Sequence, residues 1–324
     1  SSSAASDVYK RQVMVWLQAL IGLIILLIAG DILVRGAVNF SLRIKIPAFI
    51  VSLTVVALGT SAPELLVAIR ATLDNSPGIA LGNVVGSNIA NVLLVLGIPA
   101  LIAGINTSES KTAKNYVFMM LATLVFLSLA FLGSFSVSEG IIFLILLTLF
   151  LSIAVRDSLQ GKAEVSYLEV ENVDPNLALW KIMLFLSLGL IGLPIGADIL
   201  VKNASLIATS YGISDEVVGL TLVAVGTSLP ELATTLMAAV RRQADVALGN
   251  VIGSNIFNIL AIVGITTMFG DIPISSSFYE FDFWIMLGAG IVLFPFVFMG
   301  LSINRLWGAF LTLAYASYLY LTIQ

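Results

Sequence analysis

The sequence contains no cysteine and no histidine, and only 10% of its 324 residues are charged. The absence of cysteine excludes disulfides and thiolate metal sites. The absence of histidine excludes imidazole metal ligands and the commonest general base, so an enzyme is the least favoured class of function. No cofactor is expected. The cation ligands that remain are carboxylates, hydroxyls, amides and backbone carbonyls, which are hard oxygen donors suited to Na⁺, Ca²⁺ or Mg²⁺.

The scarcity of charge accompanies a high apolar content. Hydrophobic residues make up 59% of the chain, and the mean hydropathy is +1.07. A soluble domain carries about 25% charged residues, so this composition indicates an integral membrane protein embedded in a lipid bilayer. The 15 lysines and arginines are scattered in loops rather than gathered in a patch, which argues against nucleic-acid binding.

Ten apolar stretches are long enough to cross a membrane, which requires about 20 mostly apolar residues. The sequence therefore predicts an all-α polytopic membrane protein. The stretches form two units of five, 13–155 and 180–324, joined by a polar linker at 156–179. The ten stretches are 14–36, 47–72, 80–104, 113–133, 137–155, 180–203, 214–240, 247–269, 281–300 and 305–322.

Two polar segments are set apart from these units. Residues 1–12, SSSAASDVYKRQ, have no counterpart in the second half. We interpret them as a foreign leader, with a native disordered tail as the alternative. The acidic residues of the 156–179 linker do not follow the spacing of a calcium-binding EF-hand loop, so a solvated connector is the better interpretation.

The two units repeat each other at a constant offset of 167 residues, the distance from Glu64 to Glu231. ALGTSAPE at 57–64 returns as AVGTSLPE at 224–231, and the later LGNVVGSNIAN returns as LGNVIGSNIFN. An odd number of spans forces the second copy to enter the membrane from the opposite face. The sequence therefore predicts ten transmembrane helices arranged as two inverted five-helix repeats, with a transport site between them.

Loop charges predict the orientation, because cytoplasmic loops carry an excess of lysine and arginine. If both termini lie outside, the outer loops beyond the leader hold only Arg70 and Lys202. The inner loops then hold Arg35, Arg43, Lys45, Lys111, Lys114, Arg156, Lys162, Lys181, Arg241, Arg242 and Arg305. The linker is accordingly predicted to be cytoplasmic.

The motif G-T-S-x-P-E places a proline and a glutamate inside an apolar span of each copy. Pro63 and Pro230 each remove one helical hydrogen bond and free a backbone carbonyl. Glu64 and Glu231 lie near the middle of their spans, where a charge is costly and usually functional. Close helix packing would explain the small residues of the motif. It does not explain a glutamate at the same place in both copies.

The motif G-N-x-x-G-S-N-x-x-N adds hydroxyls and amides. Ser87 and Asn91 are four residues apart and share one helix face, and Ser254 and Asn258 do the same. An asparagine amide can offer its oxygen to a cation or hold another ligand in place. An interhelical hydrogen bond without a ligand role is the alternative for each asparagine.

The other asparagines of this motif have different predicted roles. Asn83 and Asn250 fall on nearly the same face as the serines, and a ligand role and an interhelical hydrogen bond are equally favoured for them. Asn88 and Asn255 point elsewhere on the helix and are predicted to serve packing.

The remaining charges within or beside the spans give weaker signals. Asp31 precedes Arg35 by four residues, and Asp198 precedes a lysine at the same spacing, which is the geometry of a structural ion pair on a helix. Glu280 and Asp282 flank a span and are predicted to be solvated.

At these motifs the chain resembles the cation/Ca²⁺ exchanger superfamily, most closely its prokaryotic sodium/calcium exchanger branch, over residues 14–322. The resemblance implies a site formed by the second, third, seventh and eighth of ten helices. The expected location is a prokaryotic inner membrane, and the expected functional unit is a monomer. The resemblance also implies Glu64 and Glu231 as the central Ca²⁺ carboxylates. The further ligands it implies for Ca²⁺ and Na⁺ are Thr60, Ser61, Thr227, Ser228, Ser87, Ser254, Asn91, Asn258 and the backbone oxygens of Ala57 and Ala224.

The resemblance implies an electrogenic Na⁺/Ca²⁺ antiporter and leaves alternatives open. The amides at Asn91 and Asn258 argue against K⁺ co-transport, because the potassium-dependent branch is associated with an acid at the second position. The proton-coupled branch usually has an acid where this chain has serine in G-S-N, which disfavours Ca²⁺/H⁺ exchange without excluding it. A cation-binding membrane protein that does not transport is the third hypothesis.

Overall fold

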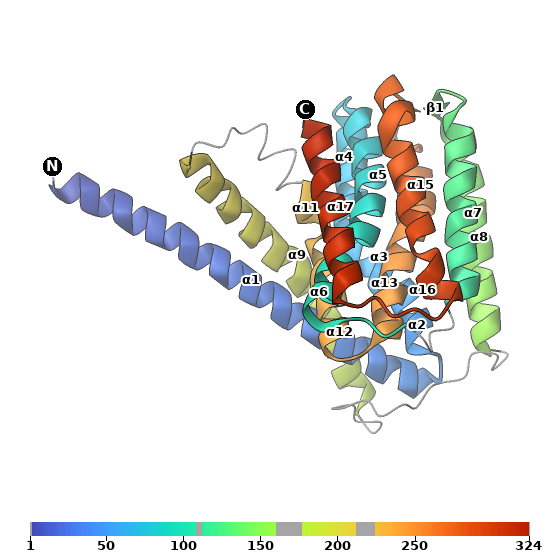
Figure 1. Cartoon of the computed structure of the whole chain (residues 1–324), viewed down its shortest axis with the longest axis horizontal. Coiled ribbons are helices and arrows are strands. Elements are labelled where there is room, and N and C mark those ends of the chain that lie inside the picture. The colour runs from blue at the N-terminus through green and yellow to red at the C-terminus, as the bar shows by residue number, and fades with distance from the viewer. Residues whose placement is uncertain (1, 108–111, 160–176, 212–223, 324) are drawn as a thin grey trace.

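The computed structural model describes residues 2–107, 112–159, 177–211 and 224–323. It is a helical bundle from which two long helices, α1 and α9, extend to one side (Figure 1). The first-unit elements are α1 (Ser2–Ile44), α2 (Ala48–Val51), η1 (Ser52–Val56), α3 (Ala57–Thr60), α4 (Ala62–Leu73), α5 (Pro77–Leu93), α6 (Gly97–Ala103), α7 (Ala113–Ala130), β1 (Ser134–Phe135) and α8 (Val137–Leu159). The second-unit elements are α9 (Leu179–Ser210), α11 (Ala224–Thr227), α12 (Leu229–Val240), α13 (Ala244–Phe257), η3 (Asn258–Ile262), α14 (Val263–Thr266), β2 (Ile272–Pro273), η4 (Phe278–Asp282), α15 (Phe283–Val292), α16 (Phe294–Phe298) and α17 (Arg305–Ile323).

Within the described residues, seven helices are long and apolar enough to cross a membrane, and one bent pair would make an eighth. They correspond to the predicted spans one to six, eight and nine. The seventh predicted span, 214–240, lies partly outside the described residues, and its described part contains α11 and α12. The tenth coincides with α17, whose 19 residues give a length of about 28 Å, close to the thickness of a bilayer core.

Two segments were predicted to lie outside the spans, residues 1–12 and the 156–179 linker. Helix α1 begins at Ser2, so residues 2–12 have helical backbone continuous with the first span. The interpretation of this stretch as a foreign leader or a native tail stays a prediction. Most of the 156–179 linker lies outside the described residues, between the end of α8 and the start of α9.

Two short extended pairings occur among the helices of the described residues, and neither was predicted. Strand β1 pairs with β2 in antiparallel register, Phe135 opposite Ile272. An isolated bridge joins Ile105 to Ile303. Both pairings connect loops of the first unit to loops of the second, so they fasten the two units at the helix ends.

Helices α1 and α9 pack closely along a seam of glycines. A Cβ atom on Gly22 would lie 2.6 Å from the Leu200 backbone nitrogen, and one on Gly189 would lie 2.5 Å from the Leu33 Cβ. Glycine at these positions lets the two backbones approach, as is common between membrane helices. The residue numbers fall along α9 as they rise along α1, so the first helices of the two units run antiparallel.

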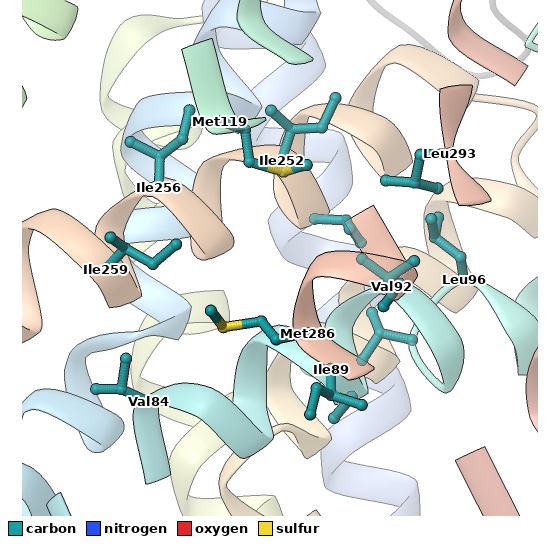
Figure 2. Close-up of a cluster of buried hydrophobic side chains, with 14 of the residues drawn as sticks. Val84, Ile89, Val92, Leu96, Met119, Ile252, Ile256, Ile259, Met286 and Leu293 are labelled. Carbon is teal, nitrogen blue, oxygen red and sulfur yellow. The ribbon is translucent and has the colours of Figure 1, made fainter. Parts of the chain in front are cut away.

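The centre of the bundle is built from the G-N-x-x-G-S-N helices. The apolar stretch of Ala244–Thr266 is 100% buried and that of Pro77–Ala103 is 78% buried, against 22–39% for the other straight spans. Figure 2 shows the apolar side chains that close around α5 and α13, including Ile89 and Ile252, with Met119 from α7 and Met286 from α15. The outer helices expose large apolar side chains such as Trp16 and Ile24, as expected for lipid contact.

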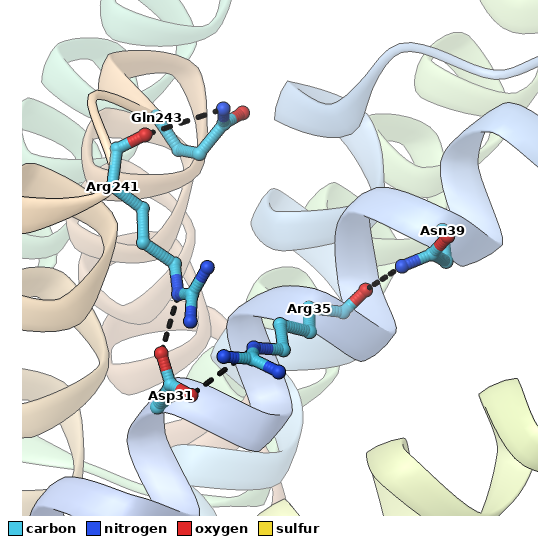
Figure 3. A network of polar contacts seen from close by, with 5 residues as sticks. All are labelled: Asp31, Arg35, Asn39, Arg241 and Gln243. Atoms are coloured by element: carbon cyan, nitrogen blue, oxygen red, sulfur yellow. Dashed lines mark hydrogen bonds and ion pairs between the residues drawn. The ribbon is translucent and has the colours of Figure 1, made fainter. Parts of the chain in front are cut away.

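The predicted ion pairs on α1 and α9 are confirmed. Arg35 Nε lies 3.1 Å from Asp31 Oδ2, and Lys202 Nζ lies 2.8 Å from Asp198 Oδ2. Asp31 has a further partner that the sequence did not reveal, because Arg241 Nε donates to its other carboxylate oxygen (Figure 3). This contact joins α1 of the first unit to the end of α12 in the second.

The two acids near the ninth span differ from each other. Glu280 is exposed, as predicted. Asp282 is only partly exposed and accepts a hydrogen bond of 2.9 Å from the Tyr318 hydroxyl on α17. The prediction of a freely solvated side chain was therefore wrong for Asp282, because α17 packs beside it.

Candidate cation site

The G-T-S-x-P-E motif breaks the helix at the same residue in both units. Helix α3 ends at Thr60 and α4 begins at Ala62, with a bend of 40° between the two segments. Ser61 between them has φ −83° and ψ 3°, and Ser228 in the second copy has φ −87° and ψ 4°. Each proline therefore stands in the first turn of a new helix, where its missing N–H is tolerated.

This break places Glu64 and Glu231 in the first turns of α4 and α12. Both side chains are only 1% exposed. The unpaired N–H groups at a helix N-terminus favour negative charge, so the local backbone stabilises a carboxylate at each position. Ser61 Oγ donates to Glu231 Oε1 at 3.3 Å, which brings the motif of one copy to the carboxylate of the other.

Most of the unpartnered polar atoms in the described interior belong to the predicted ligand set. A buried oxygen without a hydrogen-bond partner is costly, and each one calls for a ligand or another explanation. Within the described residues, the unpartnered oxygens of the set are Glu64 Oε2, Glu231 Oε2, Ser228 Oγ, Ser254 Oγ, Asn91 Oδ1 and Asn258 Oδ1. The others are Asn39 Oδ1, Thr112 Oγ1 and Thr266 Oγ1.

The remaining members of the predicted set lie in or next to the two breaks or on α5. Thr60, Ser61 and Ser87 are buried, and Thr227 is partly buried and has interactions of its own. The Ala57 carbonyl accepts from the Ser61 N–H at 3.0 Å and from Thr60 Oγ1 at 3.3 Å. Ala224 begins α11, at the edge of the described residues.

Asn83 and Asn250 brace the two breaks in equivalent ways. The Asn83 amide donates to the Glu64 carbonyl at 3.1 Å, and the Asn250 amide donates to the Glu231 carbonyl at 3.3 Å. Asn83 and Asn250 therefore lie on the sides of α5 and α13 that contact the two broken helices. The contacts shown are interhelical hydrogen bonds to the backbone.

The second copy has an additional brace that the sequence analysis missed. Asn250 Nδ2 also contacts Thr235 Oγ1 at 3.1 Å, and Asn250 Oδ1 accepts from Thr60 at 3.4 Å. Alanine occupies the matching position of the first copy, Ala68, so Asn83 has no such partner there. The signal in the sequence was a threonine in an apolar helix where the repeat has alanine.

Asn255 was also assigned the wrong role. It was predicted to serve packing, yet its Oδ1 accepts a hydrogen bond of 3.0 Å from Asn91 Nδ2. Asn88, its counterpart in the first copy, donates to the Val84 carbonyl of its own helix at 2.7 Å. The two copies are therefore alike in sequence and different in contacts at this position.

Among the described residues, the predicted ligand set contains two carboxylates, those of Glu64 and Glu231. No group of three acidic side chains that could hold a metal ion occurs among the residues that the structure describes. Two carboxylates surrounded by hydroxyl and amide oxygens provide oxygen ligands for a hard cation without a dense negative cluster. The fold and the site thus define a helical membrane protein with an interior suited to small cations.

Comparison with known proteins gives the family. The family model described as sodium/calcium exchanger protein matches residues 14–156 and 181–324. A putative antiporter, CaxA of Alkalimonas amylolytica, is 36% identical over 93% of this chain and 96% of its own length. The sodium/calcium exchanger MaX1 of Methanosarcina acetivorans is 31% identical over 93% of this chain and 96% of its own.

The fold agrees with a solved structure of the same family. The sodium-calcium exchanger NCX_Mj, soaked with Na⁺ and Sr²⁺, matches with a TM-score of 0.80 and 32% identity over 94% of this chain and 97% of that one. This chain belongs to the sodium/calcium exchanger protein family, in the prokaryotic branch of the cation/Ca²⁺ exchanger superfamily. The family is one of exchangers, not enzymes.

Proposed function

We propose that this protein is a secondary active antiporter that exchanges Na⁺ for Ca²⁺ by alternating access, without K⁺. The observation that carries the proposal is the buried pair Glu64 and Glu231 at matching helix breaks, each with one unpartnered oxygen among the described residues. Relatives named as sodium/calcium exchangers support the choice of ions.

The proposed architecture is ten transmembrane helices in two inverted repeats. The antiparallel packing of α1 on α9 supports the inversion, because these are the first helices of the two copies. We place both termini outside and the 156–179 linker in the cytoplasm of a prokaryotic cell, with the protein acting as a monomer. The charge distribution of the loops supports this orientation.

The proposed ligands are oxygens in and beside the two helix breaks, on the facing helices α5 and α13, and at the start of η3, which continues α13. Glu64 and Glu231 hold Ca²⁺ centrally, and neutral oxygens complete the Ca²⁺ shell and the flanking Na⁺ shells. These neutral ligands are Thr60, Ser61, Thr227, Ser228, Ser87, Ser254, Asn91, Asn258 and the carbonyls of Ala57 and Ala224. The unpartnered oxygens of Ser228, Ser254, Asn91 and Asn258 support this assignment.

Charge balance determines the energetics of the proposed cycle. Two ionised glutamates are neutralised by one Ca²⁺, whereas three Na⁺ leave one positive charge. Exchange of three Na⁺ for one Ca²⁺ would therefore move one net charge, worth about 2.3 kcal/mol per 100 mV. A negative interior then favours Na⁺ entry and Ca²⁺ exit. Two unpaired carboxylates in an apolar path are costly, so the empty site does not reorient and exchange is coupled.

The moving elements in this proposal are α1 and α9, which slide together across the core. They pack on each other through a glycine seam, and only 28% of each apolar stretch is buried. Neither helix carries a proposed ligand. Where α1 meets the core it touches α12: a Cβ on Gly30 would lie 3.4 Å from Met237 Cγ.

This contact provides a test of the sliding motion. The chain has no cysteine, so the double substitution Gly30→Cys and Met237→Cys introduces the only thiol pair, with the second sulfur near the present position of Met237 Cγ. The new Cβ on residue 30 would also lie 3.0 Å from the Ala233 carbonyl oxygen, so a small local shift is expected in every variant that carries it. We expect oxidation to abolish Ca²⁺ uptake while Ca²⁺ binding is retained, and reduction to restore uptake. Each single-cysteine variant under the same oxidant is the control. Full transport by the crosslinked protein would show that α1 does not move relative to α12.

Coupling to protons instead of Na⁺ is the second candidate. The unpartnered Oε2 atoms of Glu64 and Glu231 favour it, because a buried carboxylate oxygen without a donor can bind a proton as well as a metal ion. In that case the protein would exchange Ca²⁺, or another divalent cation, for H⁺. A cation-binding protein without transport is less favoured, since the helix breaks occur in both copies.

One transport experiment separates these functions. We expect wild-type protein in Na⁺-loaded proteoliposomes to accumulate ⁴⁵Ca²⁺ only while the outward Na⁺ gradient lasts, with no stimulation by K⁺. An inside-positive potential should increase uptake, because Na⁺ exit carries the net charge outward. Uptake driven equally well by a pH gradient without Na⁺ would replace the proposal with Ca²⁺/H⁺ exchange. Ca²⁺ binding without uptake would indicate the non-transporting protein.

A further inference from the structure

A short relay of polar side chains runs from the proposed site to the outer helix α7. Asn91 Nδ2 donates to Asn255 Oδ1 at 3.0 Å, and Asn255 Nδ2 contacts the Met119 sulfur at 3.7 Å. All three side chains are at least 96% buried. We propose that Asn255, oriented by Met119, is a positioning residue that turns the Asn91 oxygen toward the cation. This inference rests on the proposed function.

The direction of the relay follows from the chemistry of its last member. A thioether sulfur has no hydrogen to donate and is only a weak acceptor, so Asn255 must turn its NH₂ group toward Met119. Its oxygen then points the other way and accepts from the Asn91 NH₂ group. The Asn91 oxygen takes no part in this bond and has no hydrogen-bond partner among the described residues.

The position of Asn91 makes this orientation matter for a cation. Asn91 shares an α5 face with Ser87, and Asn83, which donates to the Glu64 carbonyl, lies on nearly the same face. An oxygen on that face attracts a cation, whereas an NH₂ group in its place would repel one. The relay therefore keeps an acceptor rather than a donor on the face that looks toward the site.

The relay exists in only one of the two copies. Met286 occupies the position of Met119 in the second unit, and Asn88 occupies that of Asn255 in the first. Asn88 donates within its own helix, and no hydrogen bond to the Met286 sulfur is described in the part of the chain that the structure covers. The chain thus supplies matched controls in Met286 and Asn88.

The test replaces the relay residues in the full-length protein. Met119→Leu keeps the volume and removes the acceptor, and Asn255→Leu removes the second link. We expect both to raise the KM for Ca²⁺ by about threefold to tenfold, the effect of one lost hydrogen bond, with the maximal rate within about twofold of wild type. Met286→Leu and Asn88→Leu should leave the KM unchanged. Equilibrium ⁴⁵Ca²⁺ binding should weaken in parallel with the KM.

The outcomes separate this inference from the proposed function. If wild type exchanges Na⁺ for Ca²⁺ and the KM of Met119→Leu is unchanged, the inference is overturned and the function stands. An equal shift in Met286→Leu also overturns it, because a general change in the packing of apolar side chains around α5 and α13 would then explain both. If wild type binds Ca²⁺ without exchanging it, the proposed function fails and equilibrium binding still tests the relay. Should Asn255→Leu fail to fold, Met119→Leu decides alone.

Discussion

Replacing either Glu64 or Glu231 by glutamine is expected to abolish ion exchange. The amide has the shape of the carboxylate and lacks its charge, so one negative charge would remain where Ca²⁺ needs two. Removing one partner from a buried charged set costs about 3–5 kcal/mol, which corresponds to at least a hundredfold loss of Ca²⁺ affinity. Uptake of ⁴⁵Ca²⁺ driven by a Na⁺ gradient should therefore fall to background in each variant.

The matched control for this prediction is Glu280→Gln. Glu280 is exposed and lies far along the chain from both motifs, so its substitution should leave uptake and KM unchanged. Both site variants should elute as monodisperse protein, because an amide replaces a carboxylate without a change of volume. The prediction is contradicted if either variant keeps more than about a tenth of wild-type uptake.

The second large effect is expected at Gly253, where alanine should disrupt the bundle itself. A Cβ atom there would lie 2.4 Å from the Leu53 backbone oxygen and 2.7 Å from the Ala57 Cβ. Both contacts come from the segment that leads into the first helix break, so α13 and that segment would have to separate. Overpacking of this kind costs about 1–3 kcal/mol, and it would also shift the Ala57 carbonyl. We expect a lower Tm and at least a tenfold loss of exchange.

Gly288→Ala provides the comparison. Apart from its chain neighbours and the adjacent backbone of its own helix, no described atom lies within 4 Å of a Cβ built on Gly288, and this glycine is on α15, away from the helix breaks. The Tm and the uptake of this variant should match those of wild type. A Gly253→Ala protein with an unchanged Tm would show that the core tolerates a separation of α13 from the first helix break.

The sequence predicted the fold class and most of the spans because the bilayer imposes simple rules. A helix of apolar residues is the stable way to cross hydrocarbon, so length and hydropathy alone located α5, α7 and α8. The same reasoning located the carboxylates, because a charge in the middle of a span is too costly to be incidental. The helix breaks at Ser61 and Ser228 followed from the prolines two residues later.

Predictions that depended on neighbouring helices were less reliable. Helical periodicity grouped Asn83 and Asn250 with the serines of their motif, and both asparagines donate to a glutamate carbonyl. It did not show that Asn255, on another face, bonds to Asn91, because that contact depends on how α5 and α13 cross. Asp31 was matched to Arg35 on its own helix, and the Arg241 partner from α12 went unseen. Asp282 was expected to be solvated, but α17 packs beside it and Tyr318 donates a hydrogen bond to its carboxylate.

The sequence by itself determined the local features of this protein: apolar spans, broken helices, two intramembrane glutamates and the duplication that sets them 167 residues apart. The duplication is read directly from the sequence, and the spans, breaks and glutamate positions follow from forces acting along a few turns of one helix. The tertiary structure alone decided which polar groups are paired and which oxygens remain unpartnered. The two copies have nearly the same motif but differ in these contacts, because a hydrogen bond depends on the side chains of the neighbouring helix. Asn250 contacts Thr235 in the second copy, whereas the matching position of the first copy is Ala68.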